Sequence, residues 1–178
     1  DTTNLNRLRG RLDQVGVPKI EIAAQRVYEA NPYADLHLFP QGLTRDSLDA
    51  FVFEKPQPRI IFEAMDSFEM KIRVRLAARR AQCAVVSMAN IGDRVLVDVE
   101  RYDVDSTLAL FNGRAGDTPE KILSNPDLTE ADKHRYAVQL VGMENIPQRA
   151  LDSVKEIGKT LAGRPQLMST VTISGGLA

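Results

Sequence analysis

RIIFEAMDSFEMKIRVRLAARRAQCAVVSMA, residues 59–89, decides the fold class of this chain. It holds two compact apolar runs of strand length, Arg59 to Met65 and Cys83 to Ala89, on either side of a longer segment. In that segment, Ser67 to Gln82, apolar residues recur every three or four positions, which predicts an amphipathic helix. Strand, helix and strand in this order are typical of a parallel sheet covered by helices. We therefore expect an α/β fold with a doubly wound, mostly parallel, Rossmann-like sheet.

The flanking segments continue the alternation of helices and strands. Upstream, the spacing of apolar residues predicts a helix over Pro18 to Ala30, and alternation predicts a short strand over Asp35 to Pro40. A further helix is expected over Ser47 to Phe53. Downstream, the alternating pattern of Arg94 to Tyr102 predicts another strand after a short turn.

The second half of the chain has a different pattern. A loop rich in Gly, Asn and Pro over Asn112 to Pro126 precedes expected helices over Glu130 to Val141 and Pro147 to Leu161. We expect a single partial domain over residues 1–178, divided into a core at 1–105, a helical crossover or insertion at 106–164, and the start of a late helix at 165–178.

The first residues lack a feature that such a sheet normally has. A doubly wound sheet usually opens with a strand and a glycine-rich phosphate-binding turn, and Asp1 to Gly16 contains neither. The segment ending at Ala178 has no polar cap. We therefore expect the sheet to be incomplete at the N-terminus and both ends of the chain to have been cut.

Composition excludes several classes of protein. With 178 residues, 43% hydrophobic residues and a net charge of -1, the chain is neither a disordered acidic segment nor a strongly basic nucleic-acid scaffold. One cysteine and two histidines provide neither an internal disulfide nor a paired zinc-binding pattern. No apolar run approaches the roughly 18 residues of a membrane span. We expect a cytoplasmic protein that binds neither nucleic acid nor membranes.

Two charged residues stand where open α/β sheets and helix ends bind anions or metals. Lys19 lies in the first turn of its predicted helix, where it is either a solvated lysine near Glu21 or a contact for a phosphate. Asp66 lies between a predicted strand and a helix. There it either caps the helix, with Glu69 reaching back, or binds magnesium that bridges nucleotide phosphates.

Other polar side chains have simpler interpretations. Lys71 belongs to a run of basic residues along the central helix, and such runs are usually a solvated face. Cys83 opens an apolar strand and is expected to be a small buried hydrophobe rather than a nucleophile. His37 and His134 have no nearby serine or cysteine partner, so no nucleophilic triad is indicated.

An ordered set of short motifs carries a family resemblance. The motifs are Asn4-Leu5-Asn6-Arg7, Val17-Pro18-Lys19-Ile20-Glu21, Asn31-Pro32 and Asp66-Ser67-Phe68. In order and spacing they resemble the ubiquitin-activating-enzyme-like, ThiF/MoeB-type family. The resemblance implies a doubly wound sheet that binds ATP at its carboxyl edge. It also implies adenylation of the C-terminal carboxylate of a ubiquitin-like or sulfur-carrier protein.

The resemblance also implies roles for individual residues. Asn4 and Arg7 would approach the nucleotide and its phosphates, Lys19 would contact phosphate, and Asp66 would hold magnesium. Lys71 stands where the family often has an arginine, which keeps the charge but loses the planar fork. Arg7, Lys19 and Asp66 are the expected catalytic residues, and Asn4 and Lys71 are the additional residues expected to bind ATP.

Two hypotheses follow for the intact protein. The first is an ATP- and magnesium-dependent adenylating enzyme of this family. The second is a non-catalytic binding or scaffold module, favoured by the absent glycine-rich turn and by Ser67 and Lys71. We also expect a homodimer, for which the helical segment offers apolar residues that could equally form an internal core: Leu140, Val141, Leu151, Val154 and Ile157.

Overall fold

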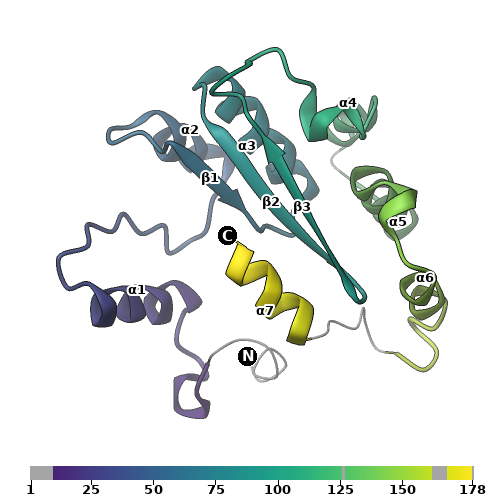
Figure 1. The fold of residues 1–178 in the computed structure, drawn as a ribbon, viewed down its shortest axis with the longest axis horizontal. Coiled ribbons are helices and arrows are strands. Elements are labelled where there is room, and N and C mark those ends of the chain that lie inside the picture. Colours follow the sequence, from purple (N-terminus) through teal and green to yellow (C-terminus); the bar gives the residue numbers. More distant parts are fainter. Residues whose placement is uncertain (1–9, 126, 162–167, 178) are drawn as a thin grey trace. The chain divides into compact units, whose positions relative to one another are not determined.

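The structure is a computed structural model that describes residues 10–125, 127–161 and 168–177. It divides into two compact units, Asp1–Thr44 and Arg45–Ala178. Figure 1 shows the elements of both units along the chain.

The first unit contains the predicted N-terminal helix. After a short 3-10 helix, η2 (Leu12–Gln14), helix α1 spans Lys19–Ala30 and follows Pro18. It ends at Asn31, because the residue before Pro32 disfavours helical backbone. The strand predicted over Asp35 to Pro40 is wrong: this segment contains neither helix nor strand. Alternation alone does not make a strand, which also needs a neighbour to hydrogen-bond with.

The second unit is built on a three-stranded sheet with the order β1-β2-β3. Strand β1 (Ile60–Glu63) runs parallel to β2 (Ala84–Ile91), and helix α3 (Phe68–Arg80) connects them. This parallel strand-helix-strand unit confirms the predicted α/β, Rossmann-like class. Helix α2 (Arg45–Phe53) precedes β1 and lies against α3.

The third strand extends the sheet in the opposite direction. β3 (Arg94–Glu100) pairs antiparallel with β2, with Val86 opposite Val99. Gly92 and Asp93 are the only residues between the two strands, and a two-residue connection joins antiparallel strands only. Gly92 has a φ of 63°, which the tight turn requires and which glycine adopts without strain.

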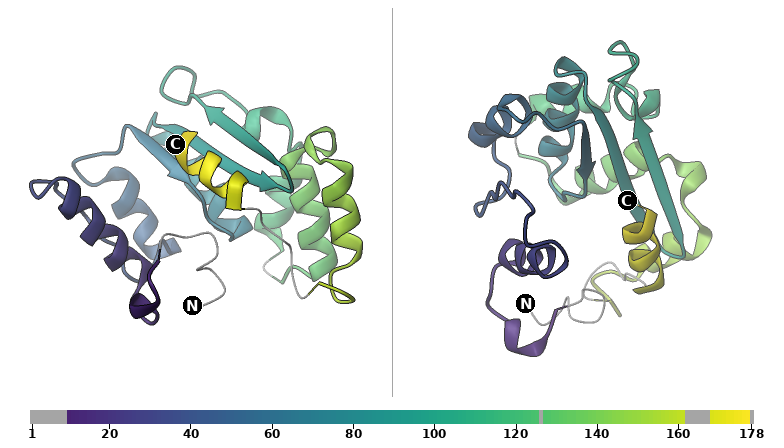
Figure 2. Two further views of the ribbon diagram at one scale, coloured as in Figure 1. Left: turned by 60° about the horizontal axis from the view of Figure 1, so that its bottom comes forward. Right: turned by 60° about the vertical axis from the view of Figure 1, so that its left-hand side comes forward.

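The helical segment packs on α3. Its described elements are η3 (Leu110–Gly113), α4 (Thr118–Ser124), α5 (Glu130–Val141), η4 (Met143–Asn145) and α6 (Gln148–Lys155). Helix α4 lies inside the segment expected to be a loop. In Figure 1 and Figure 2, α4, α5 and α6 follow one another along one side of the β2–β3 hairpin.

Helix α6 ends earlier than its sequence pattern predicts. It stops at Lys155, and Gly158 follows with a φ of 82°, a conformation that breaks helical backbone. The expected late helix is present as α7 (Met168–Leu177), which lies against β2 and β3 (Figure 2).

An apolar core lies between α3 and the helical segment. It contains Ile72 of α3, Phe111 of η3, Ile122 of α4, and Tyr136 and Leu140 of α5. Leu140 is therefore part of the internal core and is not available as a contact between subunits.

The two faces of the sheet differ in chemistry. The register places Phe62, Val86 and Val99 in one row across the three strands, and Phe62 and Val99 are about half exposed. On the opposite face, the next row brings together Glu63, Ser87 and Asp98. The polar face holds the candidate site.

Candidate functional site

The turn between β1 and α3 is the carboxyl end of a parallel strand, where open α/β sheets bind ligands. β1 ends at Glu63, and α3 begins at Phe68. The N-cap is Ser67, whose Oγ accepts a hydrogen bond from the Met70 amide at 3.3 Å. The expectation that Asp66 caps the helix with Glu69 is therefore wrong, and Glu69 instead pairs with Arg45 and Arg73.

Asp66 is left without a structural task. Its side chain is exposed and makes no hydrogen bond or ion pair within the described part of the chain. The capping role that could have explained an acid at position 66 belongs to Ser67. A free carboxylate at the carboxyl end of a parallel strand is available for a cation or for solvent.

Glu63, only three residues earlier, is the opposite case. It is 2% exposed, and its two oxygens accept four hydrogen bonds. Oε1 accepts from the Met65 amide at 2.7 Å and from Lys71 Nζ at 2.9 Å; Oε2 accepts from Lys71 Nζ at 3.2 Å and from Arg75 Nη1 at 3.0 Å. Two oxygens offer about four acceptor sites, so this carboxylate is saturated.

The charge of Glu63 is fixed by its neighbours. Burial raises the pKa of the Glu63 carboxyl, but the opposing charges of Lys71 and Arg75 outweigh it, so the pKa lies below its ordinary value. Glu63 is therefore ionised at neutral pH, although it is buried.

Lys71 has a different environment from the one its sequence context indicates. Its side chain is 24% exposed, and its ammonium is bound to Glu63. Lys71 is thus the exposed end of a buried ionic network, not a member of a solvated face. Arg73, two residues along α3, keeps the solvent-side position and pairs with Glu69.

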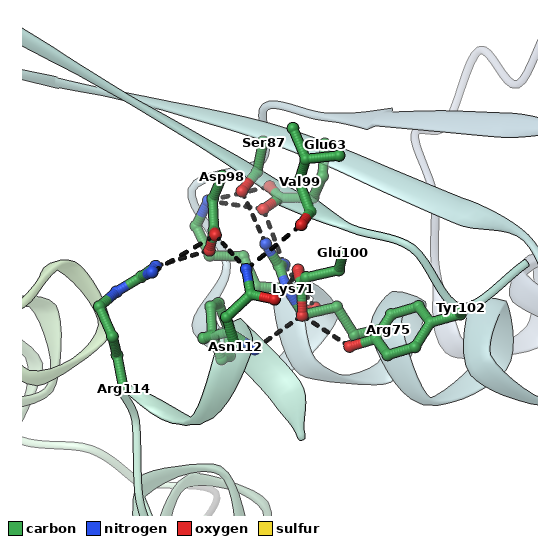
Figure 3. A network of polar contacts seen from close by, with 11 residues as sticks. Glu63, Lys71, Arg75, Ser87, Asp98, Val99, Glu100, Tyr102, Asn112 and Arg114 are labelled. Carbon is green, nitrogen blue, oxygen red and sulfur yellow. Dashed lines mark hydrogen bonds and ion pairs between the residues drawn. The ribbon is translucent and has the colours of Figure 1, made fainter. Parts of the chain in front are cut away.

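Arg75 is the centre of that network, which Figure 3 shows from close by. The side chain is 1% exposed. Its Nε donates to Glu100 Oε2 at 2.6 Å, Nη1 to Glu63, and Nη2 to Ser87 Oγ at 2.8 Å. The guanidinium also lies 4.0 Å from the centre of the Phe111 ring, a cation–π contact.

Glu100 links the network to the segment after the sheet. Its Oε1 accepts from the Tyr102 hydroxyl and from the Phe111 amide, both at 2.6 Å. Burial first, and then the hydrogen bond to Glu100, raise the pKa of the Tyr102 hydroxyl well above its ordinary value. Tyr102 therefore stays protonated and acts as a donor.

Asp98, which precedes Glu100 on β3, also binds the segment after the sheet. It accepts from Asn112 Nδ2 and from Arg114 Nη2, both at 2.6 Å. Phe111 and Asn112 have φ values of 55° and 52°, in the left-handed region that non-glycine residues rarely adopt. The carboxylates of β3 thus hold the η3 turn in a conformation with a local cost.

The structure locates most of the residues predicted from sequence. In the second unit, Asp66 lies in the connection between β1 and α3, and Lys71 lies in the first turn of α3. Lys19 is the first residue of α1 in the first unit and is exposed. Asn4 and Arg7 lie outside the described residues.

The buried acids and their arginine are not among the residues predicted from the sequence. Glu63 and Glu100 sit at inward positions of their strands, and Arg75 at an inward position of α3. When the apolar period predicts a buried position and a charged residue occupies it, that residue is expected to be buried together with a residue of opposite charge.

Cys83 is the small buried residue that the sequence predicts, and both histidines are exposed. Cys83 is 2% exposed, and burial raises the pKa of its thiol, so it is a poor nucleophile. His134 is exposed, and its Nδ1 lies 3.2 Å from the Glu130 carbonyl oxygen in its own helix. His37 is exposed and lies 3.7 Å from Asp35.

The donor chemistry of the β1–α3 turn fits magnesium bound together with a nucleotide. Magnesium prefers oxygen ligands and is commonly held by one or two carboxylates plus phosphate oxygens. Asp66 supplies one free carboxylate. Within residues 10–125, 127–161 and 168–177, no three His, Cys, Asp or Glu side chains form a group that would hold a metal. In such a site, phosphate oxygens and water would supply the other ligands.

Among the described residues, no helix combines the length and the apolar character of a membrane span. No solved structure matches the chain. A protein of Mycobacterium tuberculosis (strain CDC 1551 / Oshkosh), named "Uncharacterized protein MT1398", is 34% identical over 173 residues. The alignment covers 97% of this chain and 23% of that protein, so the chain spans about a quarter of the length of this curated relative.

The sequence model of the ThiF family matches residues 1–112. The match includes α1, the β1–α3–β2 unit, the Asp66 turn and β3. It covers more than half of the chain and agrees with the parallel strand-helix-strand unit of the second unit. The chain belongs to the ThiF family.

Proposed function

We propose that the protein containing this chain adenylates the C-terminal carboxylate of a ubiquitin-like or sulfur-carrier protein, using ATP and magnesium. Members of the ThiF family in general act on such carriers with these cofactors. The observation that carries the proposal to this chain is Asp66, a carboxylate that follows the carboxyl end of a parallel strand and has no partner among the described residues. Because Ser67 caps α3, capping does not account for Asp66.

Each residue assigned to ATP or magnesium has a limited electrostatic task. Asp66 holds magnesium through a carboxylate oxygen, and the exposed ammonium of Lys19 attracts phosphate. Arg7 and Asn4 are assigned to the nucleotide by motif. Bound ATP supplies the phosphorus that the carrier's carboxylate attacks, with pyrophosphate as the leaving group. The only cysteine, Cys83, is buried, so the proposal includes no thioester step on this chain.

The test is exchange of labelled pyrophosphate into ATP by the full-length protein in the presence of candidate carrier proteins. Asp66→Asn keeps the shape of the side chain and removes its charge, and Lys19→Gln removes the charge of the ammonium. We expect each to lower exchange by about tenfold or more, since loss of one charge interaction in the transition state costs at least ~1.4 kcal/mol.

Matched controls separate site effects from general effects. Glu120→Gln removes an exposed carboxylate on α4, and Arg26→Gln removes an exposed cation on α1. Both controls should exchange at the rate of the unmodified protein. If Asp66→Asn and Lys19→Gln also exchanged at that rate, the site assignment would fail.

A second candidate is a non-catalytic ThiF-like binding or scaffold module. It is favoured by the positions where the chain departs from the family motif: Ser67 serves as a helix cap, and the Lys71 ammonium is engaged by a buried acid. Both residues therefore have structural tasks. Carrier binding by the full-length protein without any pyrophosphate exchange would favour this candidate.

We also propose that the protein forms a homodimer. Leu140 is used in the internal core, but Val154 on α6 is 38% exposed, and the apolar face of the sheet exposes about half of Phe62. Exposed apolar side chains of this kind favour association.

A further inference from the structure

Lys71 and the backbone that leads to Asp66 share one acceptor atom. Glu63 Oε1 accepts from the Met65 amide at 2.7 Å and from Lys71 Nζ at 2.9 Å. Met65 is the residue immediately before Asp66. A single buried oxygen therefore fixes both the start of the Asp66 turn and the position of the Lys71 ammonium. Figure 3 shows Glu63 and Lys71 in this polar network.

The Glu63 carboxylate is itself fixed by buried charged residues. Arg75 Nη1 donates to Glu63 Oε2 and to the Lys71 carbonyl, both at 3.0 Å. Arg75 is in turn anchored by Glu100 through a 2.6 Å bond. Because Glu63, Arg75 and Glu100 are each no more than 2% exposed, water does not compete for these bonds.

The ion pair between Lys71 and Glu63 makes Lys71 part of this arrangement. The buried groups are two carboxylates, Glu63 and Glu100, and one guanidinium, Arg75. The Lys71 ammonium supplies the second positive charge. The Lys71 side chain is 24% exposed, and its ammonium donates to both oxygens of Glu63. Because an ammonium has three donors, one remains for a ligand, in an orientation that the bonds to Glu63 set.

We propose that Glu63 is a positioning residue, which holds the Lys71 ammonium as an oriented donor next to the Asp66 turn for a phosphate oxygen of the bound nucleotide. This inference rests on the proposed function for its ligand. Its structural component, the restraint of Lys71 by Glu63, is independent of that function. Glu63 touches no ligand itself, because its oxygens are saturated by the chain.

The first experiment measures the restraint directly in the full-length protein. Lys71 is labelled with an amine-reactive ester, and its labelling rate is followed by mass spectrometry in the unmodified protein and in Glu63→Gln. We expect Lys71 to react about fivefold faster or more in Glu63→Gln, since the ammonium loses its carboxylate partner. An unchanged rate would overturn the proposal.

A matched control exists on α5. Lys133 pairs with Glu130 at 2.6 Å, but both side chains are well exposed, at 46% and 81%. Glu130→Gln should change the labelling of Lys133 by less than about twofold, because exposed pairs restrain their partners weakly. If Glu130→Gln changed Lys133 as much as Glu63→Gln changes Lys71, the special restraint by Glu63 would be refuted.

The second experiment measures the affinity for Mg·ATP by calorimetric titration of the full-length protein. We expect Glu63→Gln to raise the Kd about threefold to tenfold, although Glu63 does not contact the nucleotide. An unchanged Kd in Glu63→Gln, with a raised Kd in Asp66→Asn, would refute the positioning role and leave the proposed function intact. If neither variant changed the Kd, the proposed function would fail, and the labelling result alone would decide the restraint of Lys71.

A second variant tests the proposal in case Glu63→Gln does not fold. Glu63→Asp keeps the charge that Arg75 needs but withdraws the carboxylate by one methylene from Lys71. We expect it to unfold cooperatively on heating and to label faster at Lys71 than the unmodified protein. Labelling of a folded Glu63→Asp at the unmodified rate would count against the proposal.

Discussion

At Arg75, a guanidinium with 1% of its side chain exposed lies between two buried carboxylates. Replacing it with methionine keeps the aliphatic packing but leaves Glu63 and Glu100 buried without their shared partner. We expect Arg75→Met to lower the free energy of unfolding by about 3–5 kcal/mol. Arg73→Met, two residues away on the exposed side, should cost no more than about 1 kcal/mol. Urea unfolding of both variants measures the difference. Equal losses of unfolding free energy would show that burial of the Arg75 ion pairs does not increase their contribution to stability.

Glu69 makes the free energy of unfolding depend on pH in the acid range. One oxygen of Glu69 accepts from Arg45 Nε at 2.5 Å and also from Arg73 Nε. The hydrogen bond from Arg45 is the main cause that lowers the pKa of Glu69 from 4.5 to about 2, and Arg73 adds to it. Because the folded-state pKa is the lower one, this contribution is complete above pH about 4.5 and is lost as pH falls toward about 2.

The expected result is a pH-dependent difference between the unmodified chain and Glu69→Gln. At pH 7 the variant should be less stable by about 0.2–1 kcal/mol, the usual range for a partly exposed ion pair. The gap should narrow between pH 4.5 and 2. Urea midpoints at pH 7, 4, 3 and 2 test this, and a constant gap would contradict the assignment of the pKa to these arginines.

On the scale of the elements, the start of α3 separates a structural residue from a proposed functional one. Ser67 Oγ accepts from the Met70 amide, whereas Asp66 makes no such bond. We expect Ser67→Ala to lower the free energy of unfolding by about 1 kcal/mol, the usual cost of a lost N-cap. Asp66→Ala should leave it within about 0.5 kcal/mol of the unmodified value. Thermal unfolding of the two variants provides the comparison, and a larger loss in Asp66→Ala would restore the capping role to Asp66.

On the scale of the whole molecule, the prediction is a homodimer. The row Phe62, Val86 and Val99 crosses the sheet on its apolar face, and Phe62 and Val99 remain about half exposed. We expect light scattering of the full-length protein to give twice the monomer mass at micromolar concentration and to decline on dilution. Phe62→Glu should weaken the dimer if the sheet face forms the contact, and Val154→Glu if α6 does. A monomer mass at every concentration would remove the prediction.

Local patterns in the sequence determined the elements and the family. The apolar periods of residues 59–89 predict β1, α3 and β2 and therefore the α/β class, and the ordered motifs predict the family that the chain belongs to. They also identify Asp66, because a residue's position between a strand and a helix can be read locally. Such signals depend only on neighbours a few residues apart, and sequence displays these directly.

Only the tertiary structure decided which side chains are partners. Glu63 and Arg75 are 12 residues apart, and Arg75 and Glu100 are 25 apart. No sequence period relates these three residues. The two glutamates meet Arg75 because the strand register and the packing of α3 place all three on the same face of the sheet. Two wrong predictions have the same cause. The alternating segment Asp35 to Pro40 forms no strand because no neighbouring strand pairs with it. The basic residues of α3 do not form one solvated face, because Arg73 is partly exposed and Arg75 is buried. Burial and pairing are properties of the assembled fold, since both depend on groups distant in sequence.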